Sequence, residues 1–347
     1  MEPTYPSQKK KEYTVKLRAI LRELPPFCSD YFRACDASTS VLTRYGYAVD
    51  QRSFFQYLVT LDDLFPEKAL PSLDMADLRK VKPCHIEMFL QEMSLYEKND
   101  RELANQDRAK SRKLSAIRAL FHYLFQNELL PSNVAELVAT PKIHEKAIIR
   151  MEPNEVADML DLAESGDKLT AQQKRFHQQT GMRDSAILTL FLGTGIRISE
   201  LVGIDIPDVD FENGEFAVTR KGGARAILSF GDEVSDALKP YYEWRLLQTA
   251  AEGHEKALFL SLQKKRITPR TVENLVKKYA SAAAPLKKIT PHKLRSTFGT
   301  MLYHETQDIY LVADVLGHKD VNTTRKHYAA TSEENKRIAA RTIRLRD

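Results

Sequence analysis

Apolar residues recur at intervals of three and four along much of the first half of this chain. In the stretch RKLSAIRALFHYLFQNELL (112–130) they form one stripe, made up of Leu114, Ile117, Leu120, Phe121, Leu124 and Phe125. This is the period of an α-helix that packs on one side. The same spacing in residues 40–61 predicts a second helix of this kind. The first half of the chain is therefore expected to be helical.

The second half combines helices with one short hairpin. The stretch GEFAVTRKGGARAILSF (214–230) predicts two strands joined at Lys221-Gly222-Gly223. An apolar segment at 183–204 breaks at Gly193 and Gly195 and then resumes as an amphipathic helix, whereas the polar stretch 164–182 is expected to be an exposed excursion. Further helices are expected at about 153–164, 232–250, 268–284, 291–304 and 308–316. The predicted fold class is mainly α, with a small β-sheet in a mixed α+β second domain.

The length of 347 residues exceeds the usual size of one domain, roughly 100–200 residues, so two domains are predicted. Pro131 ends the helix at 112–130, and a short helical segment is expected to follow it. The stretch ATPKIHEKAIIR (139–150) has the polar, charged and proline content of a linker. We therefore expect an N-terminal domain over 1–138, a linker over 139–150, a second domain over 151–330, and a C-terminal tail or helix over 331–347.

The net charge of +5 is modest, but the basic residues gather in two runs. Residues 108–127 hold five basic residues and no acidic one, and residues 264–295 hold ten basic residues against Glu273. Either run alone could be a solvated face, but two runs, one in each half, favour a surface that meets a polyanion. The candidate contacts to such a polyanion are Arg108, Lys110, Arg112, Lys113, Arg118, Lys264, Lys265, Arg266 and Arg270.

The remaining bulk features favour a cytoplasmic protein without membrane contact. No apolar run approaches the roughly 20 residues that cross a bilayer, and the N-terminal MEPTYPSQKKKEY lacks the apolar stretch of a signal peptide. The three cysteines, Cys28, Cys35 and Cys84, lack metal-ligand spacing and fit reduced thiols.

Four short motifs in the second half could carry chemistry. GTGIRISE places Arg197 after a glycine break, with Glu200 one helical turn later and able to brace it. TRKGG places Lys221 at an open hairpin tip. TPHKLRSTFGT puts His292 and Arg295 on one helix face, and LGHKDVNTTRKHY contains His318 and Tyr328.

Each motif also has an ordinary structural interpretation. An Arg with a Glu three residues later is commonly a surface ion pair, and a Lys in a Gly-Gly hairpin is usually a solvated turn residue. GTG is only a weak match to a phosphate-binding loop, because it lacks the full glycine spacing. His304, His318 and His327 do not sit at ligand spacing with carboxylates nearby, so no metal site is predicted.

Taken together, the motifs suit metal-free attack on a phosphodiester. Guanidinium groups match the charge on non-bridging phosphate oxygens with paired hydrogen bonds. A tyrosine can form a covalent phosphoryl intermediate, but its pKa of about 10 means that it needs help to lose its proton. Histidine is suited to that help near neutral pH. The departing sugar oxygen needs a proton, which a lysine on a hairpin could supply.

These residues resemble the tyrosine site-specific recombinases. The family order of arginine, hairpin lysine, His-x-x-Arg, histidine and tyrosine is matched by Arg197, Lys221, His292, Arg295, His318 and Tyr328. The stretches VTRKGG, ALFLSL and ITPHKLR, and the polar residues before Arg183, are most similar to Xer-type recombinases of the single-recombinase, XerS-like kind. RKLSAIRALFHYLFQNELLPSN resembles the last helices of the family's N-terminal DNA clamp.

The resemblance implies a helical N-terminal DNA-clamping domain and a catalytic domain. It implies that Tyr328 attacks the scissile phosphate, that Arg197 and Arg295 hold its oxygens, and that Lys221 protonates the leaving oxygen. His292 would assist proton transfer at the tyrosine, His318 would hydrogen-bond the phosphate, and Glu200 would support Arg197. Neither a metal nor another cofactor is implied.

The implied partners are a double-stranded DNA recombination site and a homotetramer formed on two such sites. In such a tetramer, residues 331–347 would form a helix donated to a neighbouring subunit; a frayed basic tail is the alternative. A cell-division DNA translocase is left open as a further partner. The implied role is chromosome dimer resolution, and an integrase of a phage or conjugative element is the alternative, because the step of ten residues from His318 to Tyr328 occurs in some integrases. A type IB-like topoisomerase and a non-catalytic DNA-binding protein are the remaining alternatives.

Overall fold

The computed structural model describes residues 4–66, 68–94, 96–97, 102–103, 107–142, 149–220, 223–318, 320–322 and 324. The chain divides into two compact units, Met1–Lys146 and Ala147–Asp347. This division falls inside the segment 139–150 that the sequence marked as a linker. Within the described residues, no helix is long and apolar enough to cross a membrane.

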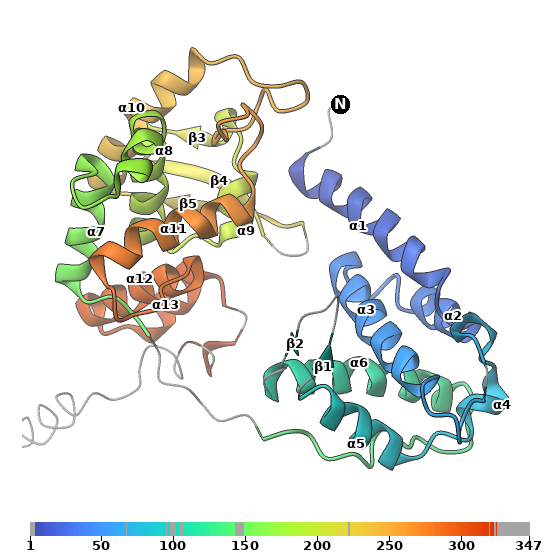
Figure 1. Ribbon diagram of the computed structural model, residues 1–347. Coiled ribbons are helices and arrows are strands. Elements are labelled where there is room, and N and C mark those ends of the chain that lie inside the picture. Colours follow the sequence, from blue (N-terminus) through green and yellow to red (C-terminus); the bar gives the residue numbers. More distant parts are fainter. Residues whose placement is uncertain are drawn as a thin grey trace, which may run out of the picture. The chain divides into compact units, whose positions relative to one another are not determined.

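The first unit is built from helices (Figure 1). Its elements are α1 (Tyr5–Leu21), α2 (Pro26–Ala34), α3 (Val41–Leu58), the 3-10 turn η1 (Leu70–Ser72), α4 (Met75–Leu78), α5 (Pro83–Glu92), the short antiparallel pair β1 (Tyr96–Glu97) and β2 (Glu102–Leu103), and α6 (Asp107–Gln126). Aromatic rings of α3, α5 and α6 meet in its core, where the ring centroids of Phe54 and Phe89 lie 5.3 Å apart and those of Phe54 and Phe121 lie 6.5 Å apart. These contacts fix the inner face of α6.

The apolar stripe predicted for α6 faces this core with one exception. Leu114, Ile117, Leu120, Phe121 and Leu124 are buried, whereas Phe125 is 44% exposed. The chain after α6 does not continue as predicted, because residues 131–138 form turns rather than a short helix. Because the apolar stripe of α6 faces the core, the opposite face of this helix can carry polar and basic side chains.

In the second unit, one long helix is packed among several other helices. Its elements are α7 (Pro153–Ser165), α8 (Ala171–Thr194), α9 (Ile198–Gly203), η2 (Ile206–Asp208), β3 (Val209–Asp210), β4 (Glu215–Thr219), β5 (Arg225–Ser229), α10 (Asp232–Leu246), α11 (Pro269–Ala283), α12 (Pro291–Thr306) and α13 (Ile309–Leu316). Helix α8 packs against α7, α10 and α12 (Figure 1). The three strands form an antiparallel sheet in the order β3-β4-β5, with Thr219 opposite Arg225 at the end nearest the hairpin turn. The predicted fold class, mainly α with one small sheet, is confirmed.

Helix α8 corrects one prediction. Residues 171–182, expected to be an exposed excursion, form the first half of this helix. Thr170 caps the start of the helix: its hydroxyl accepts a hydrogen bond from the backbone N–H of Gln173, and the Gln173 side chain accepts one from the backbone N–H of Thr170. Its second half is apolar and buried, so α8 carries the chain through the unit's core to the glycines that open the candidate site.

Candidate active site

Gly195 ends α8 in the left-handed conformation, with φ of +60°. A Cβ atom at this position would lie 2.4 Å from Cδ1 of Phe298 and 2.8 Å from Cδ2 of Leu316, so a side chain has no room. Glycine is therefore required both for the backbone angle and for the close approach of α12 and α13. The turn brings Arg197, two residues later, to the start of α9.

Arg197 is held from two directions. Its Nη1 donates to Oε1 of Glu200 at 2.8 Å, and its Nη2 donates to the carbonyl oxygens of Leu316 and Gly317, each at 3.1 Å. Glu200 is 4% exposed and also accepts from the backbone N–H of Arg197 at 3.0 Å. The sequence expectation that Glu200 can brace Arg197 matches this geometry.

Arg295 reaches the same carbonyl group from α12. Its Nη1 donates to the carbonyl oxygen of Gly195 at 2.5 Å, and its Nη2 donates to the carbonyl oxygen of Leu316. The residue is 5% exposed. Arg197 and Arg295, which are 98 positions apart in the sequence, thus share Leu316 as an acceptor at the carboxyl end of α13, where the helix dipole favours positive charge.

The turn after α13 positions His318. Gly317 takes φ of +59°, and the N–H of His318 donates back to the carbonyl oxygen of Ala313 at 2.9 Å, which closes the end of the helix. Nδ1 of His318 lies 2.8 Å from Oγ1 of Thr324. This hydrogen bond fixes the plane of the imidazole ring beside the shared arginine acceptor.

His292 lies in the first turn of α12, directly after Pro291 at the start of the helix. The side chains at 292 and 295 are three residues apart and therefore share a helix face. His292 is exposed, whereas Arg295 is buried. The two residues could thus meet a substrate at different depths of one surface.

Two of the predicted catalytic residues, Lys221 and Tyr328, lie outside the described residues, and so does the predicted subunit-contact segment 331–347. The base of the hairpin is described, and there the N–H of Arg220 donates to the carbonyl oxygen of Ala224 at 2.8 Å. The N–H of Gly223 donates to the carbonyl oxygen of Arg220 at 3.0 Å. Lys221 therefore follows directly on a residue whose backbone is fixed by hydrogen bonds.

Two tyrosines of the second unit are unsuited to be nucleophiles. Tyr241 and Tyr279 are 1% and 0% exposed. Burial raises the pKa of both hydroxyl groups, and the neighbouring Asp184 carboxylate raises that of Tyr279 further. Neither hydroxyl could reach a DNA phosphate without unfolding.

The arrangement suits an anionic ligand. Two guanidinium groups converge on a helix end whose acceptors are carbonyl oxygens, and Glu200 is the carboxylate that pairs with Arg197. A carbonyl group orients a guanidinium without neutralising its charge, so the site keeps the capacity to bind a phosphate. In the part of the chain that the structure describes, no group of three or more His, Cys, Asp or Glu side chains could hold a metal ion.

The basic run of the first unit separates into exposed and internal residues. Arg108 is exposed on α6, and Arg112 has a 53% exposed side chain although it pairs with Asp50. Lys110 pairs with Asp107 at 3.1 Å. Lys113 differs from the prediction, because it is 8% exposed and its Nζ lies 3.4 Å from the fully buried Asp50. Lys113 is thus part of the core rather than of a DNA-facing surface.

Arg118 and Arg266 are also occupied internally. Arg118 donates to the carbonyl oxygens of Ala135 and Val138 and to Oγ1 of Thr140, so it holds the segment after α6 in place. Arg266 donates to the carbonyl oxygens of Val202 and Ile204, both at 3.0 Å, and pairs with Asp205. These contacts leave both guanidinium groups poorly placed to meet DNA.

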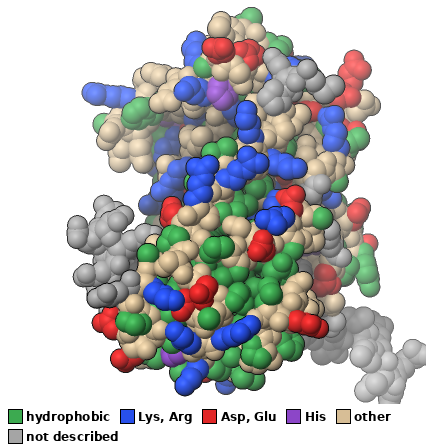
Figure 2. Space-filling model, turned by 90° about the vertical axis from the view of Figure 1, so that its right-hand side faces the viewer, with side chains coloured by type: hydrophobic (Ala, Val, Ile, Leu, Met, Phe, Trp, Pro, Cys, Tyr) green, Lys and Arg blue, Asp and Glu red, His purple; other side chains and the backbone are tan. Residues whose placement is uncertain are grey.

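Lys264, Lys265 and Arg270 are exposed, as the prediction requires for contacts to a polyanion. Arg270 pairs only at the surface, with Glu273 at 3.2 Å. Figure 2 shows Lys and Arg side chains exposed on one face of the molecule.

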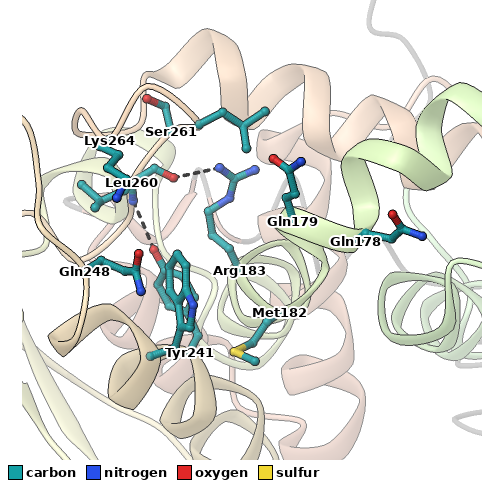
Figure 3. Close-up of a pocket in the computed structure, with 11 residues that line it drawn as sticks. Gln178, Gln179, Met182, Arg183, Tyr241, Gln248, Leu260, Ser261 and Lys264 are labelled. Carbon is teal, nitrogen blue, oxygen red and sulfur yellow. Dashed lines mark hydrogen bonds between the residues drawn. The ribbon is translucent and has the colours of Figure 1, made fainter.

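A pocket of about 370 Å³ in the second unit is lined by Lys264 together with residues of α8 and α10. Figure 3 shows its wall, where Nη1 of Arg183 donates to the carbonyl oxygen of Leu260 at 2.8 Å and the N–H of Leu260 donates to the hydroxyl oxygen of Tyr241 at 3.2 Å. The Arg183 guanidinium is also paired with Asp184. None of the predicted catalytic residues lines this pocket.

Residues 150–335 match the phage integrase family, which places more than half of the chain within that family's domain. The chain belongs to the phage integrase family and is a tyrosine recombinase, an enzyme that cleaves and rejoins DNA through a phosphotyrosine intermediate. Tyrosine recombinase XerC of Thermodesulfovibrio yellowstonii is 34% identical over 249 residues, which cover 71% of this chain and 77% of that protein. Tyrosine recombinase XerC of Chlorobaculum parvum is 26% identical over 332 residues, covering 92% and 94%.

Two solved structures share the fold. XerH site-specific recombinase bound to palindromic difH substrate superposes with a TM-score of 0.65 at 20% identity, covering 90% of this chain and 83% of that one. The Tn1549 transposon integrase in complex with circular intermediate DNA superposes with a TM-score of 0.63 at 19% identity, covering 92% and 100%. The recognition of a tyrosine recombinase from sequence motifs is thereby confirmed, and the single-recombinase subtype stays a prediction.

Sequence reasoning did not single out three kinds of group at or near the candidate site. The carbonyl acceptors of Leu316, Gly317 and Gly195 are invisible to motif matching, because every residue carries such a group. Thr324, which orients His318, lay within the quoted stretch but was not singled out. The side chain of Arg220 was also passed over, although it precedes the predicted lysine.

Proposed function

We propose that this chain performs site-specific recombination with Tyr328 as nucleophile. The observation that carries the proposal is the convergence of Arg197 and Arg295 on the carbonyl group of Leu316, beside His318. Two guanidinium groups held in this way can bind the non-bridging oxygens of one phosphate and stabilise the charge that develops there.

In the proposed step, Oη of Tyr328 attacks the scissile phosphorus. The new O–P bond gives a 3′-phosphotyrosine, the bond from phosphorus to the 5′ oxygen breaks, and the electron pair leaves with that oxygen. His292 assists removal of the tyrosine proton, and Lys221 gives a proton to the leaving oxygen. His318 hydrogen-bonds the phosphate, and Glu200 supports Arg197. Rejoining runs the same step in reverse with a new 5′-hydroxyl, so no bond energy is lost.

The proposed test uses a DNA substrate nicked close to the cleavage site, so that the released fragment diffuses away and the protein stays attached. Wild type should form an adduct that survives a denaturing gel, and Tyr328→Phe should form none. A persistent adduct in Tyr328→Phe would show that another residue is the nucleophile. Absence of an adduct from wild type on DNA that it binds tightly would favour a non-catalytic binding protein.

The proposed biological role is Xer-like resolution of chromosome dimers by a homotetramer acting on two identical sites in the cytoplasm. The XerC relatives favour this role. The described cysteines, Cys28, Cys35 and Cys84, are free thiols, which is compatible with a reducing compartment. A cell-division translocase would be a regulator rather than part of the chemistry.

The second candidate is a mobile-element integrase, favoured by the shared fold of the Tn1549 integrase and by the ten-residue step from His318 to Tyr328. The two roles differ in their substrates. Resolution of a plasmid dimer that carries two copies of one site would support the Xer role. Recombination only between two different attachment sites would support the integrase. Relaxation of plasmid independent of sequence would instead favour a topoisomerase.

Exposed basic residues would supply most of the DNA affinity through phosphate contacts. The proposed contacts are Arg108, Lys110, Arg112, Lys264, Lys265 and Arg270, all of which the structure leaves at least partly exposed. The internal roles of Lys113, Arg118 and Arg266 remove these three residues from the set.

A further inference from the structure

The side chain of Arg220 crosses from the hairpin base to the turn that follows α13. Its guanidinium lies where a side chain of Gly317 would begin: a Cβ atom at 317 would be 2.2 Å from Nη1 of Arg220, 2.5 Å from Cζ and 3.0 Å from Nη2. Two segments that are almost 100 residues apart are thus in contact through one arginine and one glycine. Gly317 with its positive φ makes this contact possible.

This contact adds a third guanidinium to the candidate site. The carbonyl oxygen of Gly317 accepts from Nη2 of Arg197, and the carbonyl oxygen of Leu316 accepts from both Arg197 and Arg295. Arg197, Arg295 and Arg220 therefore meet at two consecutive residues. His318 is the next residue along the chain.

Arg220 differs from the other two arginines because no group in the described part of the chain accepts a hydrogen bond from its side chain. Its Nε is buried without an acceptor there, and its guanidinium pairs with none of the described carboxylates. A buried donor without a partner is unfavourable and rare in native proteins. The residue as a whole is only partly buried, and the substrate of this family of enzymes is a polyanion that offers acceptors to a guanidinium at the active site.

We propose that Arg220 is a third phosphate-binding guanidinium, which contacts the scissile phosphate or its immediate neighbour on the cleaved strand. The proposal rests on the proposed function, since it takes Arg197 and Arg295 as ligands of the scissile phosphate. The planar fork of a guanidinium suits two oxygens of a phosphate. Among the described residues, Glu200 is the carboxylate that pairs with one of these guanidinium groups, through Arg197, so positive charge is in excess at the site.

The experiment measures DNA affinity in the Tyr328→Phe background, where the DNA stays uncut. Single methylphosphonate groups, each of which replaces one charged phosphate oxygen by a methyl group, are placed in turn at the scissile phosphate and at the three phosphates on each side. Affinities are compared for the full chain with Arg220, Arg220→Gln and Arg220→Lys. Each pairing of a variant with a modified DNA forms a double-mutant cycle.

Arg220→Gln should weaken binding to unmodified DNA roughly tenfold. The same substitution should have almost no effect on DNA that is neutral at the scissile phosphate or the one beside it. The slope of log affinity against log salt should become shallower by about one contact. Arg220→Lys keeps the charge, so it should keep the slope while losing part of the affinity.

Arg225→Gln is the matched control. Arg225 stands on the same hairpin, opposite Thr219, but its side chain is 72% exposed and already paired with Asp208 at 2.8 Å. It should show no coupling to the scissile phosphate or to its neighbours. Fluorescence of Trp244, the only tryptophan of the chain, checks that each variant has kept the fold of the second unit.

The proposal would be overturned if Arg220→Gln lost the same affinity on all the modified DNAs and the salt slope did not change. Arg220 would then only pack against Gly317. Coupling confined to a distant phosphate would overturn it as well. A Tyr328→Phe chain that still cuts DNA would contradict the assigned nucleophile and not the role of Arg220.

Discussion

Glu200 and Glu155 occupy the same local position in two different helices. Each accepts a hydrogen bond from the backbone N–H three residues earlier, at 3.0 Å from Arg197 and 2.7 Å from Glu152. Each also pairs with a cation, Arg197 at 2.8 Å and Lys287 at 2.6 Å. They differ in that only Arg197 belongs to the proposed active site, so comparing the two glutamates separates a general capping effect from an effect on catalysis.

Glu200→Ala should slow adduct formation about 100-fold, because a misplaced Arg197 no longer matches the phosphate. Glu155→Ala should lose a comparable helix cap, about 1 kcal/mol of stability, and keep a rate within about twofold of wild type. Rates on the nicked substrate and thermal unfolding of both variants provide the comparison. Equal slowing by the two substitutions would mean that Glu200 acts on the fold alone.

The pKa of Glu155 also predicts how acid affects the stability of the second unit. Burial by itself would raise the pKa of this carboxyl, but hydrogen bonds from Lys287 and from the backbone of Glu152 outweigh burial and lower it. A lowered pKa means that the stabilisation is present above the ordinary Glu value of about 4.3 and is lost as the pH falls through the folded-state value. Glu155→Gln should therefore flatten this acid-side loss, which is no more than about 1 kcal/mol. Urea unfolding followed by Trp244 fluorescence at neutral pH and near pH 4 tests this, and an unchanged acid dependence would contradict it.

At the scale of elements, α3 and α6 are joined by a buried charge cluster. Asp50 of α3 is fully buried and pairs with Arg112 and Lys113 of α6. Burial raises the pKa of Asp50 despite the two cations. Removing one partner from such a cluster is far more harmful than replacing the cluster with apolar groups.

Asp50→Asn should therefore destabilise the first unit by about 3 kcal/mol, since the Lys113 ammonium stays buried without its counter-charge. Far-ultraviolet circular dichroism should show an earlier unfolding transition, whereas Trp244, which belongs to the second unit, should report an unchanged one. The double variant Asp50→Asn/Lys113→Met should recover part of the loss. If Asp50→Asn instead shifted both signals together, the two units would unfold as one.

The helices whose bounds were predicted most closely, α7, α11 and α13, each have buried apolar residues on one face. The first half of α8 was missed because its residues 171–179 are mostly exposed and show no apolar periodicity. Its start was nevertheless encoded locally, since Thr170 and Gln173 form a capping box. After Pro131 the opposite error occurred: a short helix was expected where the structure has turns held by Arg118.

The site was predictable to the extent that its residues lie in ordered motifs. Motif order alone singled out Arg197, His292, Arg295 and His318. The acceptor that Arg197 and Arg295 share, the carbonyl of Leu316, required the fold. Composition could not separate exposed from internal basic residues either. Lys113 and Arg266 find their partners more than 60 positions away, at Asp50 and at Val202 to Asp205, and such pairs cannot be read from neighbouring residues.

At the scale of the whole molecule, the reaction is expected to need neither metal nor nucleotide. The arginines supply the positive charge that a metal would otherwise bring to the phosphate, and the phosphotyrosine bond keeps the energy needed for rejoining. Cleavage and rejoining by the wild-type protein should therefore proceed without ATP, and at the same rate with and without EDTA. Activity that disappears in EDTA and returns with magnesium would contradict this expectation.

The use of backbone acceptors at the end of α13 has a genetic consequence. No missense change can delete a carbonyl oxygen, so no single substitution can remove the backbone acceptors that hold Arg197 and Arg295. The vulnerable codons are instead those of Gly195 and Gly317, where a methyl group would collide with Phe298 or Arg220. In a random screen for recombination-deficient alleles, null alleles outside the codons of the catalytic side chains should concentrate at these two glycines, and sequencing of the recovered alleles would show it.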